Sequence, residues 1–118
     1  MPHTVLFVED DKSVREVIAI FLVNAGFRVI EAASASEALQ QFDRISSLDV
    51  VLTDFKLRDD GTKLVRTLKN LRPTLPVIVI SGDPEGARTE VPQADLLLQK
   101  PISGKMIVNA ISRLVKAA

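Results

Sequence analysis

The chain contains no cysteine, tryptophan or tyrosine among its 118 residues, and its only histidine is His3. The absence of cysteine excludes disulfides and thiolate chemistry. Fifteen basic and fifteen acidic side chains give zero formal net charge, so summed charge offers no reason to expect nucleic-acid binding. No apolar run approaches the roughly 20 residues of a membrane span, and no signal peptide opens the chain. We expect a cytoplasmic chain without membrane insertion or direct nucleic-acid binding.

Length and composition predict a single domain over residues 1–118, without an output domain, because 47% hydrophobic residues suffice for a core. Short apolar runs alternate with segments of helical periodicity, which is typical of an α/β fold with a doubly wound parallel sheet covered by helices on both faces. The strand-like runs are residues 4–8, 27–30, 49–53, 77–80 and 95–99.

Helical periodicity is clearest after the first of these runs. Apolar residues recur there at three- and four-residue steps, and Gly26 follows as a left-handed stop. Further helices are expected after a cap at Ser34 or Ser36, over residues 62–71 and from residue 102 onward. The charges of residues 63–72 are interpreted as a solvated helix face. Residues 83–93 have little periodicity and predict a loop or a short helix.

Acidic residues follow two of the apolar runs. Glu9 and Asp10 come after residues 4–8, and Asp54 comes after residues 49–53. The carboxyl ends of parallel strands meet at one edge of the sheet, where ligands bind. Neighbouring carboxylates repel one another unless a proton or a cation joins them, and Mg²⁺ prefers such oxygen ligands. The sequence therefore predicts a divalent-metal site.

Two more polar residues end the other buried runs, Ser81 after residues 77–80 and Lys100, before Pro101, after residues 95–99. Each acidic or polar residue also has a simpler interpretation. Asp10 or Asp11 can cap the helix beginning near Lys12, Ser81 can be a turn residue, and Lys100 can be a solvated charge. Their joint placement at strand ends favours a shared site.

At this level of detail the chain resembles the receiver domain of bacterial response regulators, the phosphoacceptor module of two-component signalling. The resemblance covers nearly the whole chain. It is carried by residues 5–11 with Arg15, by residues 49–54, by residues 76–82 and by Lys100 with Pro101. It implies a flavodoxin-like five-stranded sheet in the order 2-1-3-4-5.

The resemblance also implies roles for individual residues. Asp54 matches the phosphorylated aspartate, Lys100 the phosphate-binding lysine and Ser81 the hydroxyl switch residue. Glu9, Asp10, Asp54 and the backbone carbonyl of Lys56 would hold Mg²⁺ or Mn²⁺. A sensor histidine kinase or a histidine phosphotransfer protein would supply the phosphoryl group, and the downstream protein is left open. Such a domain is not an enzyme with a separate substrate, since it catalyses its own phosphorylation and dephosphorylation.

The chain departs from the family pattern at several positions. Arg58 stands where the family usually has proline, and Leu97 stands where it usually has an aromatic residue. The Lys100–Pro101 bond is a candidate cis peptide. Lys56 and Asp83 should flank the phosphoryl group, where they could form an ion pair.

Two other functions compete with a phosphoacceptor. A phosphatase of the haloacid-dehalogenase type also uses a strand-end aspartate and Mg²⁺, but it has a second carboxylate two residues later, where this chain has Lys56. A pseudo-receiver that only binds proteins would share the fold and need none of the acidic set.

Overall fold

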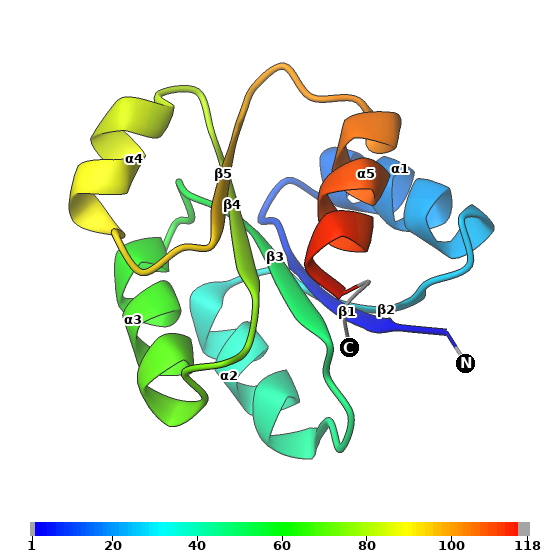
Figure 1. Cartoon of the computed structure of the whole chain (residues 1–118), viewed down its shortest axis with the longest axis horizontal. Helices are drawn as coiled ribbons and strands as arrows, with labels where there is room; N and C mark the ends of the chain where they lie inside the picture. Colours follow the sequence, from blue (N-terminus) through cyan, green and yellow to red (C-terminus); the bar gives the residue numbers. More distant parts are fainter. Residues whose placement is uncertain (1, 116–118) are drawn as a thin grey trace.

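A computed structural model describes residues 2–115, in which strands and helices alternate along the whole chain (Figure 1). The strands are β1 (Thr4–Val8), β2 (Arg28–Ala32), β3 (Val50–Asp54), β4 (Val77–Ser81) and β5 (Leu96–Gln99). The helices are α1 (Lys12–Asn24), α2 (Ala35–Arg44), α3 (Gly61–Leu71), α4 (Pro84–Glu90) and α5 (Gly104–Val115). All strand pairs are parallel and the order is β2-β1-β3-β4-β5, which confirms the predicted fold.

Helices cover the sheet on both faces, with α2, α3 and α4 on one side and α1 and α5 on the other (Figure 1). Successive side chains of a strand point to opposite faces. On β1, Leu6 and Val8 join the core under α2, α3 and α4, whereas Val5 and Phe7 join the core under α1 and α5. Because β1, β3 and β4 are buried throughout, the acidic residue Asp54 and the hydroxyl of Ser81 lie at the carboxyl ends of β3 and β4 and not in their middle.

Side-chain caps begin all five helices, and that of α5 is Ser103, whose Oγ accepts from the N–H of Met106. Asp11 caps α1 and Ser34 caps α2, while Asp60 and Asp83 cap α3 and α4. Each cap accepts a hydrogen bond from a backbone N–H that has no partner within its helix. The predicted left-handed stop after α1 is confirmed at Gly26, whose φ is 100°. The irregular segment forms α4, a helix of only seven residues.

The predicted first helix is confirmed, but much of its apolar surface faces solvent. Only Ala19 and Leu22 of α1 are buried, whereas Val17 is 68% exposed and Phe21 is 44% exposed. Apolar residues occupy more than one side of α1, so periodicity alone does not tell which side meets the sheet. No helix within residues 2–115 is long and apolar enough to cross a membrane.

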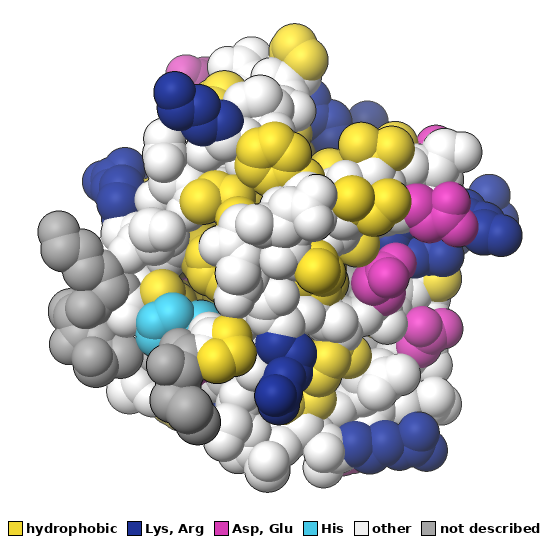
Figure 2. All heavy atoms as spheres, turned by 90° about the vertical axis from the view of Figure 1, so that its right-hand side faces the viewer, with side chains coloured by type: hydrophobic (Ala, Val, Ile, Leu, Met, Phe, Trp, Pro, Cys, Tyr) yellow, Lys and Arg dark blue, Asp and Glu magenta, His cyan; other side chains and the backbone are white. Residues whose placement is uncertain are grey.

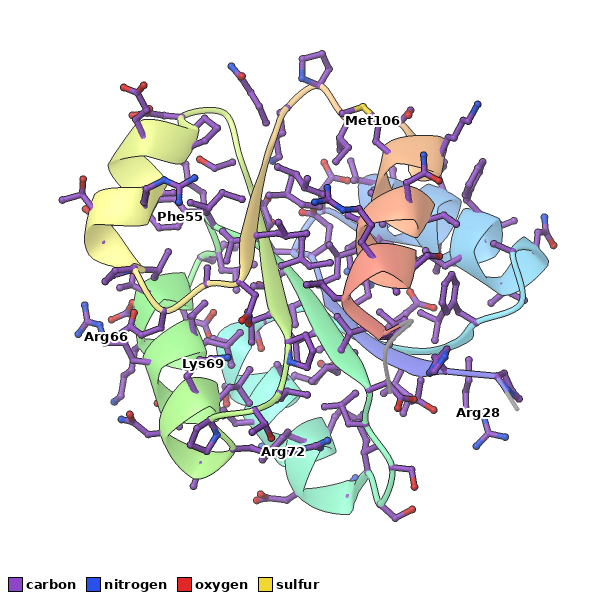
Figure 3. All side chains as sticks on the ribbon, in the orientation of Figure 1. Arg28, Phe55, Arg66, Lys69, Arg72 and Met106 are labelled. Atoms are coloured by element: carbon purple, nitrogen blue, oxygen red, sulfur yellow. The ribbon has the colours of Figure 1, made fainter. Side chains whose placement is uncertain are left out.

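Two basic side chains of the α3 region reach the edge formed by the amino ends of the strands (Figure 3). The ammonium group of Lys69 donates to the carbonyl of Leu75 and to Asp95, whose Oδ2 also accepts from the N–H of Val77. Arg72 donates to the carbonyl of Leu48. The interpretation of residues 63–72 as a solvated face is therefore wrong for Lys69, whose side chain is only 13% exposed.

Candidate functional site

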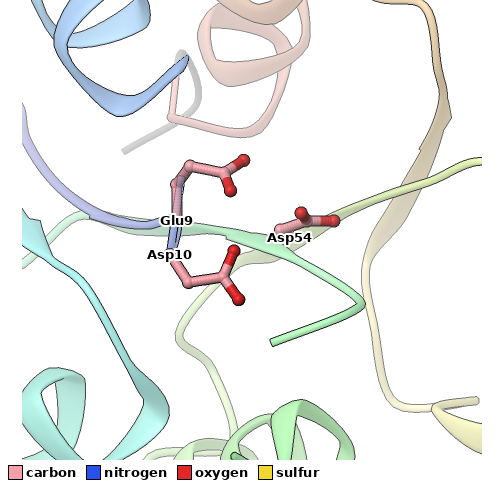
Figure 4. A group of neighbouring side chains, drawn as sticks. All are labelled: Glu9, Asp10 and Asp54. Carbon is pink, nitrogen blue, oxygen red and sulfur yellow. The ribbon is translucent and has the colours of Figure 1, made fainter. Parts of the chain in front are cut away.

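Three carboxylates meet at the carboxyl ends of β1 and β3, as the sequence predicts. Glu9 and Asp10 follow β1, and Asp54 is the last residue of β3. One oxygen from each lies within 4.8 Å of the others, and Figure 4 shows the three side chains extending into a common space. Glu9 and Asp54 are each only 5% exposed. Burial brings these negative charges together where water screens them poorly.

The two oxygens of Asp54 have different surroundings. Oδ2 lies 3.0 Å from the ammonium nitrogen of Lys100, which donates a hydrogen bond to it. Oδ1 is buried and has no hydrogen-bond partner among residues 2–115. Lys100 is placed by the bond from its own N–H to the carbonyl of Ser81, and the peptide bond to Pro101 is cis. A buried oxygen without a donor normally has a missing partner such as an ion or a water.

Glu9 is held by both its carboxylate and its backbone. Oε2 accepts from the N–H of Asp11 at 3.1 Å, and the Glu9 carbonyl accepts from Arg15 at 2.8 Å. Burial, above all, raises the pKa of Glu9 above its ordinary value. The neighbouring charge of Asp54 also raises this pKa, while the Asp11 N–H and the charge of Lys100 lower it. The carboxylate set therefore carries a desolvation cost that a cation would offset.

The alternative role of Asp10 as a helix cap is not observed. Asp11 caps α1 by accepting from Ser13 and Val14. Asp10 Oδ2 instead accepts from the backbone N–H of Arg58, 3.0 Å away in the β3–α3 loop. The cap and the cluster are thus formed by different residues, and Asp10 points into the site.

Ser81 lies at the end of β4 and is 4% exposed. Its Oγ accepts from the N–H of Asp83, and the Asp83 carboxylate accepts from Gly86 at the start of α4. The predicted ion pair between Lys56 and Asp83 is not formed, since Asp83 serves as the cap of α4 and has no basic nitrogen within 4.0 Å among the described residues. The hydroxyl is therefore linked to α4 by one short chain of hydrogen bonds.

The predicted site residues other than Ser81 line one open cavity of about 710 Å³. Its polar wall includes Glu9, Asp10, Asp54, Lys56 and Lys100. The lining also has an apolar part, made by Val14, Ile18, Ile80, Pro101 and Ile102. Hard divalent cations prefer carboxylate oxygens, and no donor for the buried Asp54 Oδ1 occurs among the described residues. The residues fit a divalent cation by their chemistry.

Sequence reasoning missed the contribution of the β3–α3 loop. The N–H of Arg58 contacts Asp10, and Asp59 accepts from the N–H groups of Ala35 and Ser36 at the start of α2. The sequence held one signal for this, because Arg58 stands where proline is usual in the resembled family and proline has no N–H. Asp59 had no signal, since its partners lie 23 and 24 residues away.

Comparisons with known proteins agree with this geometry. The sequence matches the response regulator receiver domain family over residues 5–112. The sensor kinase CckA of Brucella abortus is 33% identical over 96% of this chain, and the regulatory protein FixJ of Rhizobium meliloti is 33% identical over 94% of it. The chain spans only 12% and 56% of those proteins.

A solved structure is similar along nearly its whole length. The crystal structure of a receiver domain protein from Clostridium thermocellum has a TM-score of 0.87 and 26% sequence identity, covering 98% of this chain and 95% of that one. The sheet order and the strand-end acidic cluster occur here together with the family match over most of the chain. The chain therefore belongs to the response regulator receiver domains of two-component systems.

Proposed function

We propose that this chain is a phosphoacceptor that receives a phosphoryl group on Asp54 in the presence of Mg²⁺ or Mn²⁺. The observation that carries the proposal is the asymmetry of Asp54. One oxygen is held by Lys100 at 3.0 Å, while the other is buried beside two more carboxylates and has no donor within residues 2–115. Such a group has a free oxygen for attack and a cation beside the charge that develops.

The proposed reaction moves one phosphoryl group between two side chains. An oxygen of Asp54 forms a bond to phosphorus as the bond from phosphorus to the donor's histidine nitrogen breaks, and that nitrogen keeps the electron pair. Lys100 offsets negative charge on the phosphoryl oxygens. When bound, the divalent cation would supply further charge neutralisation. Glu9, Asp10, Asp54 and the carbonyl of Lys56 are its proposed ligands.

Ser81 is the proposed coupling residue. Its hydroxyl can donate to a phosphoryl oxygen only when Asp54 is modified, so the bond stabilises one state and not the other. Asp83 connects Ser81 to α4 by two hydrogen bonds of 2.9 and 3.2 Å. Because α4 has only seven residues, a change at Ser81 can alter a helix that has few bonds of its own. We propose that α4 is the responding element.

The surface beside the cavity supports a protein donor. Val14 and Ile18 form part of its wall, and α1 continues that apolar surface outward with Val17 and Phe21. Figure 2 shows hydrophobic side chains gathered on the face that includes α1 and α5. Exposed apolar patches commonly mark protein-interaction sites. We propose that the phosphohistidine-bearing partner, a sensor kinase or a phosphotransfer protein, binds over this surface in the cytoplasm.

The alternatives account for fewer of these features. A haloacid-dehalogenase-type phosphatase needs a second carboxylate two residues after its nucleophile, and Lys56 occupies that position. A pseudo-receiver would have no use for three carboxylates and a lysine held together at one sheet edge. We therefore retain the phosphoacceptor as the proposed function.

The proposal is tested by incubating the protein with phosphoramidate and Mg²⁺ and measuring its intact mass. We expect the addition of one phosphoryl group to the wild type. None is expected for Asp54→Asn or for the wild type in excess EDTA. Lys56→Ala is a suitable control because it keeps the proposed carbonyl ligand. An unchanged wild-type mass would support the pseudo-receiver instead.

A further inference from the structure

The β3–α3 loop makes a direct contact with the acidic cluster through its backbone. The N–H of Arg58 donates to Asp10 Oδ2 at 3.0 Å, joining residues 48 positions apart. The Arg58 side chain is exposed, so the contact depends on the peptide N–H and not on the guanidinium group. A donor that holds one oxygen of a carboxylate limits rotation of the group about its Cβ–Cγ bond, and so restricts where the second oxygen can lie.

Asp59, the next residue, holds the same loop against α2. Its Oδ1 accepts from the N–H of Ala35 at 2.8 Å and its Oδ2 from the N–H of Ser36 at 3.0 Å. Ser34 accepts from the third N–H of this helix, that of Glu37. The N–H groups in the first turn of α2 are thus satisfied by the side chains of Ser34 and Asp59, and of these two only Asp59 belongs to the β3–α3 loop.

The electrostatic setting of Asp59 favours this attachment. The first N–H groups of a helix carry partial positive charge and stabilise a carboxylate. The two backbone bonds accordingly lower the pKa of Asp59 below its ordinary value. Where the loop enters α3, Gly61 packs so closely against it that an added Cβ would lie 2.6 Å from the carbonyl oxygen of Phe55. The loop is therefore fixed at Asp10, at α2 and at its own turn.

We propose that the Arg58 N–H and Asp59 are positioning groups for the metal centre: the N–H orients Asp10, and Asp59 keeps that N–H in place by anchoring the loop to α2. This inference rests on the proposed function, because it concerns the ligands of the same divalent cation. Groups that orient metal ligands without touching the metal contribute strongly to affinity. Metal affinity in this chain is thereby coupled to the start of α2.

Arg58 offers a matched pair of substitutions. Arg58→Ala keeps the N–H and removes the side chain, whereas Arg58→Pro removes the N–H. We expect Mg²⁺ affinity, measured by titration calorimetry at constant ionic strength, to be unchanged in Arg58→Ala. We expect it to be about ten-fold weaker in Arg58→Pro, the low end of the effect of losing such a partner. Equal affinities in the two variants would overturn the inference.

Asp59 offers a second test that does not require a proline. Asp59→Ala removes both acceptors and should weaken Mg²⁺ binding about three-fold or more. Asp59→Asn keeps one acceptor, so its Mg²⁺ affinity should lie between those of Asp59→Ala and the wild type. Ser34→Ala is the control, because it removes a cap from α2 without touching the loop. An equal loss of Mg²⁺ affinity in Ser34→Ala and Asp59→Ala would mean that helix stability, and not loop position, is responsible.

Hydrogen exchange of the Arg58 amide tests the link without metal. The amide should be protected in the wild type and in Ser34→Ala, and should exchange several-fold faster in Asp59→Ala. Equal exchange rates in all three would contradict an anchoring role for Asp59. A wild type that binds no Mg²⁺ would overturn the proposed metal centre together with this inference, whereas wild-type binding with equal Arg58→Pro and Arg58→Ala affinities would overturn this inference alone.

Discussion

Lys100 and Asp54 form an ion pair in which one partner is buried and the other is not. Their nitrogen and oxygen are 3.0 Å apart, the Asp54 side chain is 7% exposed and that of Lys100 is 45% exposed. The ammonium group of Lys100 therefore keeps much of its hydration. The carboxylate of Asp54 has lost most of its contact with water and needs a charged partner to offset that loss. In the proposed reaction, this asymmetry would allow Lys100 to turn toward the phosphoryl group while Asp54 stays at the end of β3.

Removing the lysine should destabilise the metal-free protein because it leaves a buried carboxylate unpaired. We expect Lys100→Ala to lower the free energy of unfolding by about 1 kcal/mol, the low end for such a group, since the ammonium is half exposed. In an Asp54→Asn background the loss should be smaller, because the carboxylate charge is gone. Urea unfolding at pH 7 in EDTA measures both. Equal losses in the two backgrounds would show that the pair is not coupled.

The raised pKa of Glu9 predicts a pH dependence of stability. The folded protein binds more protons than the unfolded chain between the ordinary value of 4.5 and the raised value, so its stability falls as pH rises through that window. Glu9→Gln should flatten this fall and stabilise the metal-free protein at pH 7. Urea titrations between pH 4 and pH 8 provide the test. Identical pH profiles for the two proteins would refute the assignment.

Magnesium should stabilise the wild type more than it stabilises Glu9→Gln. A ligand stabilises the folded state according to its concentration relative to the dissociation constant. Since Glu9→Gln removes a negative charge from the proposed centre, we expect it to gain less stability than the wild type in excess Mg²⁺. Thermal melts with and without Mg²⁺ measure the difference, and an equal gain in both would exclude Glu9 from the metal site.

Two glycines give a test of loop packing. Gly61→Ala places a Cβ 2.6 Å from a backbone oxygen, whereas a Cβ at Gly82 meets nothing within 4 Å. Gly61→Ala should therefore cost about 1–3 kcal/mol, and Gly82→Ala should stay within about 0.5 kcal/mol of the wild type. Urea unfolding of both variants decides, and equal stabilities would mean that the loop accommodates the methyl group by moving.

The hydroxyl of Ser81 should matter for the response and not for phosphate uptake. Ser81→Ala should still accept the phosphoryl group but lose most of the change in amide chemical shifts over α4, including that of Gly86. Ser81→Thr keeps the hydroxyl and is the matched control. If Ser81→Ala and the wild type show the same shift changes on phosphorylation, Ser81 does not couple the site to α4.

The sequence predicted the sheet and the strand-end residues because both follow from short-range patterns. Buried parallel strands are continuous apolar runs, and the residue after each run is placed by the strand itself. Glu9, Asp54, Ser81 and Lys100 therefore lie where the pattern indicates. The choice between Asp10 and Asp11 as the helix cap stayed open until the backbone direction after β1 was known.

What the sequence did not reveal depends on contacts between distant segments. The attachment of Asp59 to α2 depends on how two loops meet, and no local pattern records it. Lys69 looks like a solvated charge in a helix of alternating charges, yet it reaches Asp95 across the sheet edge. On α1, apolar residues lie on several sides of the helix. Which of them are buried depends on how the helix lies on the sheet, and these are Ala19 and Leu22.

The most direct test of the central claim is to locate the phosphoryl group. The protein is incubated with phosphoramidate and Mg²⁺ and then treated with hydroxylamine, which converts an acyl phosphate to a hydroxamate, and its peptides are sequenced by mass spectrometry. We predict modification at Asp54 alone, with none in a chelated control. Modification at another residue, or at Asp54 to the same extent without metal, would contradict the proposed phosphoacceptor site.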